Sequence, residues 1–200
     1  SETTLKKISK IDTKSYKSVL KEEELEDLIK NLNEQSVIAV DTETSSLNPH
    51  EAELIGVSIS FAPNISFYIP LGHKGVKGIK KDLVLKKLKI ILEDSSIRKV
   101  GQNIKYDFII FKNYGIELNS IDDTMLLSYT LDAGNNRHNM DTLSELHLGH
   151  KTISYKDLVG TGKKQLNFSD IDLKSATEYA AEDADVTLRL YNILSERVSQ

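Results

Sequence analysis

The sequence contains no cysteine, which excludes disulfide bonds and metal sites built from thiolates. A bound metal ion must therefore be held by oxygen or imidazole ligands. No apolar run approaches the length of about eighteen residues that a membrane span needs, and the lysine-rich N-terminal stretch lacks the apolar segment of a signal peptide. These absences fit a protein of the reducing cytosol.

An excess of positive charge is also missing, because 26 basic and 30 acidic side chains give a net charge of −4. This balance does not by itself indicate a nucleic-acid-binding protein, although a cluster of acids would bias the total and lysines can still form local positive rims. The 200 residues, 39% of them hydrophobic and 28% charged, fit one globular domain.

Residues 1–19 show no apolar periodicity, which predicts an N-terminal tail or linker before a domain over residues 20–200. Short apolar runs predict strands at 37–44, 54–61, 65–71 and 97–101, and helical spacing predicts helices at 25–32, 81–92, 103–114, 123–131, 141–148 and 173–198. Strands early and helices late, with a crossover helix between them, predict an α/β domain around a mixed sheet.

Asp41 and Glu43 follow directly on the apolar run Val37–Val40. The period of two in a strand places both carboxylates on one face at its end. Two like charges removed from water are unfavourable unless protons or cations neutralise them, so a divalent metal is a natural partner. If the pair stood alone, a strand that simply ends in solvent would be the better explanation.

Further acids occur at matching places along the chain. Asp107 lies one turn after Asn103 in the helix that follows the fourth strand, and Tyr179 and Asp183 share one face of the last helix. Together with Asp41 and Glu43 they make a site for two-metal phosphoryl transfer plausible. His138, His147 and His150 do not have the ligand number or spacing of a zinc site.

Three motifs resemble those of the DEDD 3′–5′ exonucleases, in the variant whose third motif contains tyrosine: Asp41-Thr-Glu-Thr, Val100-Gly-Gln-Asn-Ile-Lys-Tyr-Asp107 and Tyr179-Ala-Ala-Glu-Asp183. Further stretches, at 113–118, 123–125, 137–138, 150–153 and 162–166, are similar to the proofreading exonuclease domain of bacterial DNA polymerase I, family A. The resemblance covers about residues 36–192. It implies a ribonuclease H-like fold, with a five-stranded mixed sheet flanked by helices.

The resemblance also implies metal-dependent hydrolysis of the 3′-terminal phosphodiester of DNA, with release of nucleoside 5′-monophosphates. Two divalent ions are expected, Mg²⁺ with Mn²⁺ as a substitute. Asp41, Glu43 and Asp183 would hold one, Asp41 and, through water, Asp107 the other, while Tyr179 and Glu43 would orient the attacking water. The positions that match substrate-binding residues of the family are Thr42, Leu47, Gln102, Asn103, Lys105, Tyr106, Arg137 and Tyr155.

The expected partner is a single-stranded or frayed 3′ end of DNA. A polymerase domain in the same longer chain is expected as well, since the sequence begins with Ser rather than Met. We expect a monomer in the bacterial cytoplasm, associated with the nucleoid. Two alternatives stay open: an RNA-directed exonuclease of the ribonuclease D type, and a non-catalytic domain that serves as a polymerase scaffold or DNA-binding module.

Overall fold

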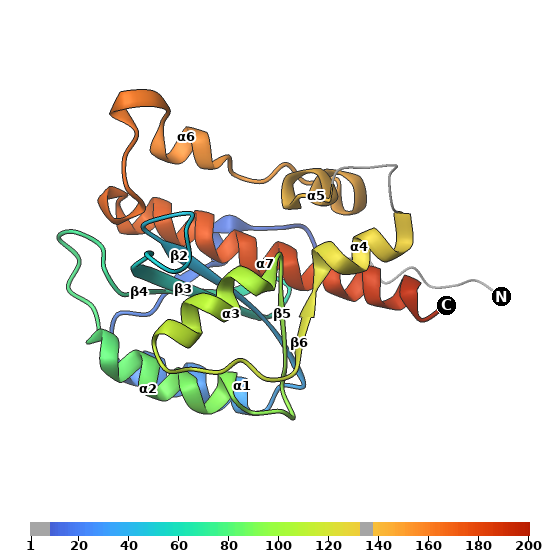
Figure 1. The fold of residues 1–200 in the computed structure, drawn as a ribbon, viewed down its shortest axis with the longest axis horizontal. Coiled ribbons are helices and arrows are strands. Elements are labelled where there is room, and N and C mark those ends of the chain that lie inside the picture. Colours follow the sequence, from blue (N-terminus) through green and yellow to red (C-terminus); the bar gives the residue numbers. More distant parts are fainter. Residues whose placement is uncertain (1–8, 133–137) are drawn as a thin grey trace.

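A six-stranded mixed sheet forms the centre of the computed structural model, which describes residues 9–132 and 138–200 (Figure 1). The strands lie in the order β1-β4-β3-β2-β5-β6. They are β1 Lys17–Ser18, β2 Val37–Thr44, β3 Leu54–Ala62, β4 Ile65–Pro70, β5 Arg98–Gly101 and β6 Ile121–Asp123. The central strand β2 pairs antiparallel with β3 and parallel with β5, which confirms the mixed sheet.

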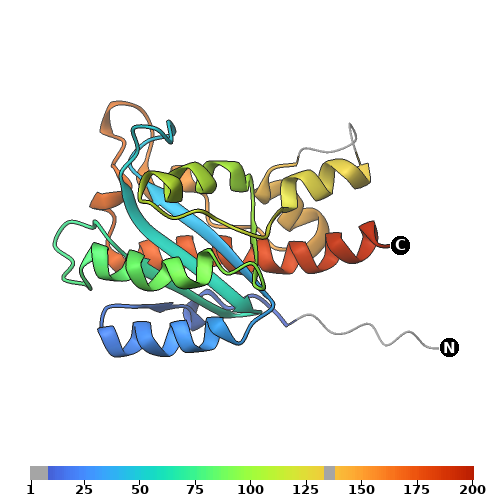
Figure 2. The ribbon, with the colours of Figure 1, turned by 60° about the horizontal axis from the view of Figure 1, so that its bottom comes forward.

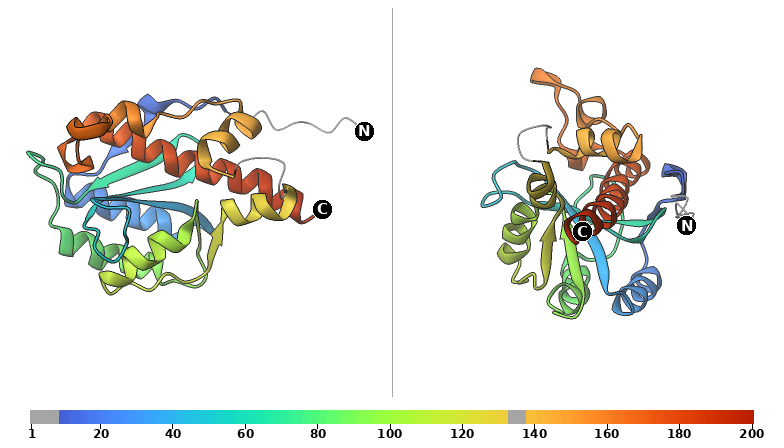
Figure 3. Two further views of the ribbon diagram at one scale, coloured as in Figure 1. Left: turned by 45° about the horizontal axis from the view of Figure 1, so that its top comes forward. Right: turned by 90° about the vertical axis from the view of Figure 1, so that its right-hand side faces the viewer.

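Helices cover both faces of this sheet (Figures 2 and 3). They are α1 Glu22–Asn33, α2 Lys81–Leu92, α3 Ile104–Asn113, α4 Thr124–Asp132, α5 Met140–Leu148, α6 Tyr155–Val159 and α7 Leu173–Val198. Short 3-10 turns lie at Thr13–Ser15, Gly162–Lys164 and Phe168–Asp170. Within the described residues, no helix is long and apolar enough to cross a membrane.

Strand β2 divides its side chains between the two layers of helices. Ile38 and Val40 are buried in the core cluster that also contains apolar side chains of α1, α2 and α3. Ala39, which lies between them, packs against Leu188 of α7. The alternation along the strand therefore assigns odd-numbered residues of β2 to the α7 side and even-numbered ones to the α3 side.

The long helix α7 carries small residues where it crosses the sheet. Ala176 and Ala180 pack with Ile55 and Tyr68 of the sheet, and all four are buried. Alanine side chains let the helix axis approach the strands closely, so that polar side chains on the same helix can meet the end of β2. The predicted helix over 173–198 matches this element.

The structure adds three elements to those expected from the sequence. Residues 121–123, part of an expected helix and its approach, form the edge strand β6, and residues 155–159 form the short helix α6. Part of the expected tail also packs on the sheet: Lys17–Ser18 pair parallel with β4, and Tyr16 and Val19 are buried. This edge strand is the sixth, where five strands were expected. Two apolar side chains in a polar segment are too few to show a period.

Candidate active site

Three carboxylates meet where β2 passes under α7. Asp41 and Glu43 lie on the same side of β2 as Ala39, and Asp183 comes from α7. One ligand oxygen from each residue can be chosen so that all lie within 4.8 Å of one another. Among the described residues, these three form a group of acids that lie close enough together to hold a metal ion. The predicted strand-end pair and the predicted α7 acid are thus brought together.

The environment of this cluster disfavours negative charge. Burial raises the pKa of Asp41 to about 6, although hydrogen bonds with Glu43, Thr42 and Asp183 oppose the shift. The pKa values of Glu43 and Asp183 are also raised well above their usual range, first by burial and then by the charge of Asp41 and other acids. Oxygen Oε1 of Glu43 is buried and has no hydrogen-bond partner in the described part of the chain. A cation would satisfy this oxygen and neutralise the cluster.

Asp107 approaches the same strand from the other layer. Its Oδ1 accepts a hydrogen bond from the backbone N–H of Thr42 at 3.0 Å and another from the Thr42 hydroxyl. Asp107 is buried, and burial followed by the charge of Asp41 raises its pKa well above the usual range. It lies near the three-carboxylate cluster without being one of its members, because Thr42 points to the α3 side of β2.

The N-terminus of α3, one turn before Asp107, is capped in an unexpected way. Asn103 was expected to be the capping residue, but its side chain makes no capping hydrogen bond, and its backbone lies in the left-handed region with φ of 55°. The Asp123 carboxylate instead accepts the backbone N–H groups of Asn103 at 2.9 Å and Ile104 at 3.1 Å. Strand β6 therefore fixes the start of the helix that carries Asp107.

Tyr179 belongs to a group of aromatic rings beside the acids. Its ring centroid lies 5.7 Å from that of Tyr155 and 6.0 Å from that of Phe168. Burial, followed by the charges of Asp183, Glu43 and Asp41, raises the pKa of the Tyr179 phenol. The phenol is therefore protonated at neutral pH and can donate a hydrogen bond next to the carboxylates.

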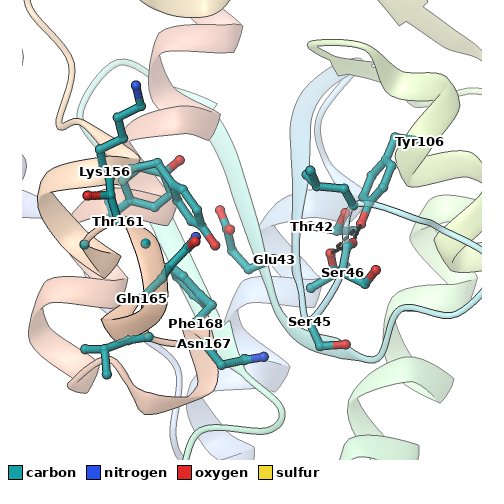
Figure 4. Close-up of a pocket in the computed structure, with 17 residues that line it drawn as sticks. Thr42, Glu43, Ser45, Ser46, Tyr106, Lys156, Thr161, Gln165, Asn167 and Phe168 are labelled. Atoms are coloured by element: carbon teal, nitrogen blue, oxygen red, sulfur yellow. Dashed lines mark hydrogen bonds between the residues drawn. The ribbon is translucent and has the colours of Figure 1, made fainter.

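An open pocket of about 900 Å³ leads to these residues (Figure 4). In Figure 4, Glu43 lies between two walls: Thr42, Ser46 and Tyr106 on one side, and the segment with Lys156, Gln165 and Phe168 on the other. Of the residues expected to bind substrate or catalyse, the pocket lining includes Thr42, Glu43, Leu47, Tyr106, Tyr155 and Tyr179.

Other expected substrate residues lie elsewhere. The amide of Gln102 donates to the His138 carbonyl at 2.8 Å and accepts from the hydroxyl of Thr124, so it is engaged within the protein. Asn103 and Lys105 are exposed at the start of α3 and do not line the pocket. Arg137 lies outside the described residues.

Sequence reasoning gave no role to most of the second wall. Lys156 of α6 lines the pocket together with Thr161, Gln165, Asn167 and Phe168 from the segment after this helix. The one sequence signal for a role of this wall was the stretch 162–166, which carries part of the family resemblance. That this stretch lies opposite β2 can be seen only in the folded chain. The three histidines named above have separate partners: His138 lies beside Ser128, His147 beside Arg197 and His150 beside Glu182.

Comparison with known proteins identifies the family. A family model described as 3′–5′ exonuclease matches residues 16–199. The chain belongs to this family, the exonuclease domain of family-A DNA polymerases. The DNA polymerase I of Rhizobium leguminosarum is 47% identical to this 3′–5′ exonuclease domain over 183 residues, which are 82% of the chain and 18% of that relative. That of Borreliella burgdorferi is 40% identical over 200 residues, 98% of the chain and 22% of the relative. The exonuclease domain thus spans about a fifth of the length of these relatives.

Solved structures confirm the fold. Brucella melitensis NrnC matches with a TM-score of 0.68 at 21% identity, over 92% of this chain and 81% of that one. Escherichia coli RNase D, an exoribonuclease involved in structured RNA processing, matches with a TM-score of 0.70 at 19% identity, over 92% and 45% of the two chains. The exonuclease domain therefore has the ribonuclease H-like fold, with six strands in its sheet.

Proposed function

We propose that this exonuclease domain hydrolyses the 3′-terminal phosphodiester of a DNA strand and releases nucleoside 5′-monophosphates, as the proofreading part of a DNA polymerase I. The observation that carries the proposal is the meeting of Asp41, Glu43 and Asp183, the second of which lines an open pocket with an aromatic wall. A domain kept only as a scaffold would have no need for a buried group of like charges, which costs stability.

The residues present fit divalent metal ions. Asp41, Glu43 and Asp183 would hold one ion, and Asp41 with Asp107 a second. Carboxylate oxygens without sulfur or a histidine partner suit a hard cation such as Mg²⁺. The fold neighbour NrnC has been solved with bound Mg²⁺. Bound ions would acidify a water molecule and neutralise charge on the phosphate.

The protein side chains would position the reactants. Glu43 accepts a hydrogen bond from the attacking water, and the Tyr179 phenol, kept protonated by its raised pKa, donates one. Thr42 keeps the Asp107 carboxylate turned toward the strand that carries Asp41. A carboxylate acceptor and a phenol donor on neighbouring elements define one direction of approach to the phosphorus atom.

The walls of the pocket suit the last nucleotides of a single strand. Leu47, which is 96% exposed, stands on the loop between β2 and β3 and can lie against a base. Tyr155, 41% exposed, offers a ring face for stacking from the opposite wall. Stacking between these side chains requires an unpaired base, so a frayed or single-stranded 3′ end is the proposed substrate.

The choice of DNA over RNA rests on the relatives, since the more similar ones are DNA polymerases while RNase D shares only the fold. A degradation assay with 5′-labelled single strands of DNA and RNA and Mg²⁺ tests it. We expect a ladder of shortened DNA products for the wild type and none for Asp41→Ala. Faster degradation of RNA would support the exoribonuclease alternative, and an inactive wild type that binds Mn²⁺ no better than Asp41→Ala would support the scaffold alternative.

A further inference from the structure

Glu182 is a buried carboxylate that the proposed mechanism does not use. It lies in α7 directly before Asp183 and is 1% exposed. Its Oε1 accepts the backbone N–H of Ile153 at 2.7 Å, and its Oε2 lies 3.0 Å from Nε2 of His150. One side chain of α7 thus contacts both ends of the segment 150–153.

This segment leads directly to the aromatic wall of the pocket. Ser154 follows it and caps α6, where its hydroxyl accepts the backbone N–H of Asp157. Tyr155 is the first residue of α6, and its ring lies 5.7 Å from the ring of Tyr179, which comes from α7. A shift of residues 150–153 relative to α7 would therefore carry Tyr155 away from Tyr179.

The other end of the anchoring is on α5. The Ser144 hydroxyl donates to the His150 carbonyl at 2.8 Å, and the Thr152 hydroxyl donates to Asp141 at 2.5 Å. These bonds keep the segment attached to α5 even when its contact with α7 is lost. The two contacts of Glu182 are consequently polar ties between this segment and α7, beside the apolar packing of Val159 and Phe168 against Ala176 and Ala180 of the same helix.

We infer that Glu182 is a positioning residue, which holds Tyr155 beside Tyr179 in the aromatic wall of the pocket and so sets the affinity for the 3′-terminal base. This inference rests on the proposed function. Glu182 does not contact the substrate itself. Its carboxylate accepts a hydrogen bond from the Ile153 N–H and lies beside the His150 ring, and it affects substrate binding through the position of Tyr155.

Steady-state kinetics on single-stranded DNA with Mg²⁺ tests the inference. Glu182→Ala removes both contacts, and we expect KM to rise about 5- to 100-fold, the range for loss of one base–aromatic stack, with a smaller change in kcat. Glu182→Gln keeps an acceptor for the Ile153 N–H and a polar group beside His150. We expect it to restore KM to within about threefold of the wild type.

A matched control separates positioning from general stability. Tyr16→Phe removes another buried hydrogen bond to α7, the one from the Tyr16 hydroxyl to Asp185 at 2.7 Å, on a part of the helix away from the pocket. We expect it to lower Tm with KM unchanged. If Tyr16→Phe raised KM as much as Glu182→Ala, the effect would be general destabilisation and the inference would be wrong.

A double variant shows whether Glu182 acts through Tyr155. Once Tyr155→Ala has removed the ring, adding Glu182→Ala should raise KM little further, because there is no ring left to misplace. Full additivity, or a wild-type KM for Glu182→Ala alone, would overturn the inference while leaving the exonuclease proposal standing. A wild type that cleaves no DNA would instead overturn the proposed function.

Discussion

Thr42 bonds to Asp107 twice through one carboxylate oxygen, with its backbone N–H at 3.0 Å and with its hydroxyl. The neighbours of Thr42 on both sides, Asp41 and Glu43, point to the opposite face of β2 and meet Asp183 of α7. One strand end therefore collects acids from both layers of helices. The residue between the two acids of the first motif has a structural task of its own.

The first prediction concerns this hydroxyl. Thr42→Val keeps the shape of the side chain and the backbone N–H bond but removes the hydroxyl donor. We expect the cleavage rate to fall roughly 10- to 100-fold, which corresponds to one hydrogen bond to a charged group, about 1.5–3 kcal/mol. Rates measured on single-stranded DNA check it, with Thr42→Ser, which retains the hydroxyl, as the control. A wild-type rate for Thr42→Val would mean that Asp107 needs no such support.

The second prediction concerns the four acids. Asp41→Ala, Glu43→Ala, Asp107→Ala and Asp183→Ala should each remove nearly all cleavage while the protein stays folded, because each relieves repulsion within a buried acidic group. Circular dichroism and a degradation assay on the same preparations check it. An unfolded Asp183→Ala, or one with wild-type activity, would contradict the assignment of the site.

The third prediction follows from the raised pKa values in the absence of metal. Asp41 titrates near pH 6 in the folded protein, above its ordinary value of 3.8, so its contribution to stability is complete below about pH 4 and is lost as the pH rises through 6. Glu43 and Asp183 shift in the same direction. In EDTA the double variant Asp41→Asn, Asp183→Asn should become progressively more stable than the wild type between pH 5 and pH 8, by on the order of 1–3 kcal/mol.

The quantity to measure is the difference in the free energy of unfolding between the wild type and the double variant. Each protein alone also becomes more stable as the pH rises, because His73 and His147 have lowered pKa values. Thermal unfolding at several pH values gives it. Mg²⁺ should then raise the Tm of the wild type at pH 8 and leave the double variant unchanged. If the difference in the free energy of unfolding stayed constant across the pH range, ionisation of these acids would not destabilise the folded protein, and the prediction would be wrong.

The sequence predicted the central part of this architecture because its signals are strong there. The stripe of apolar residues over 81–92 coincides with α2, and the run before Asp41 coincides with the buried part of β2. The two edge strands were not predicted, because pairing with a neighbouring strand determines them more than the local sequence does. Strand β6 has one apolar residue, and Lys17–Ser18 becomes a strand only beside β4. Gln102 shows a further limit: its motif position predicts a contact with substrate, but the sequence does not show that its amide bonds to the His138 carbonyl and the Thr124 hydroxyl in the folded chain.

The fourth prediction concerns Tyr179. Tyr179→Phe keeps the ring between Tyr155 and Phe168 and removes the phenol hydroxyl. We expect the rate to fall on the order of 10- to 100-fold without disappearing, because one positioning bond of about 1.5–3 kcal/mol is lost and every carboxylate remains. Single-turnover rates with saturating enzyme measure the chemical step. A loss as complete as that of Asp41→Ala would require a larger role for the phenol than orienting a water.

The last prediction concerns the substrate. The domain should degrade single-stranded DNA faster than matched duplex, and duplex with terminal mismatches at a rate in between. Leu47 and Tyr155 face the pocket from opposite walls, so a base reaches them only when it is unpaired. Opening a matched duplex costs about 1.4 kcal/mol per step, and two or three steps therefore cost roughly 3–4 kcal/mol.

This cost corresponds to a rate difference of about two to three orders of magnitude at subsaturating substrate, and a terminal mismatch removes most of it. Initial rates on three substrates with the same 3′-terminal sequence measure the difference, with Leu47→Ala as a companion variant. Because Leu47 is almost fully exposed, the Leu47→Ala variant should have an unchanged Tm but bind the terminal base more weakly. Equal rates on matched duplex and single strand would show that the pocket accepts paired ends directly, against the proposed need for an unpaired 3′ terminus.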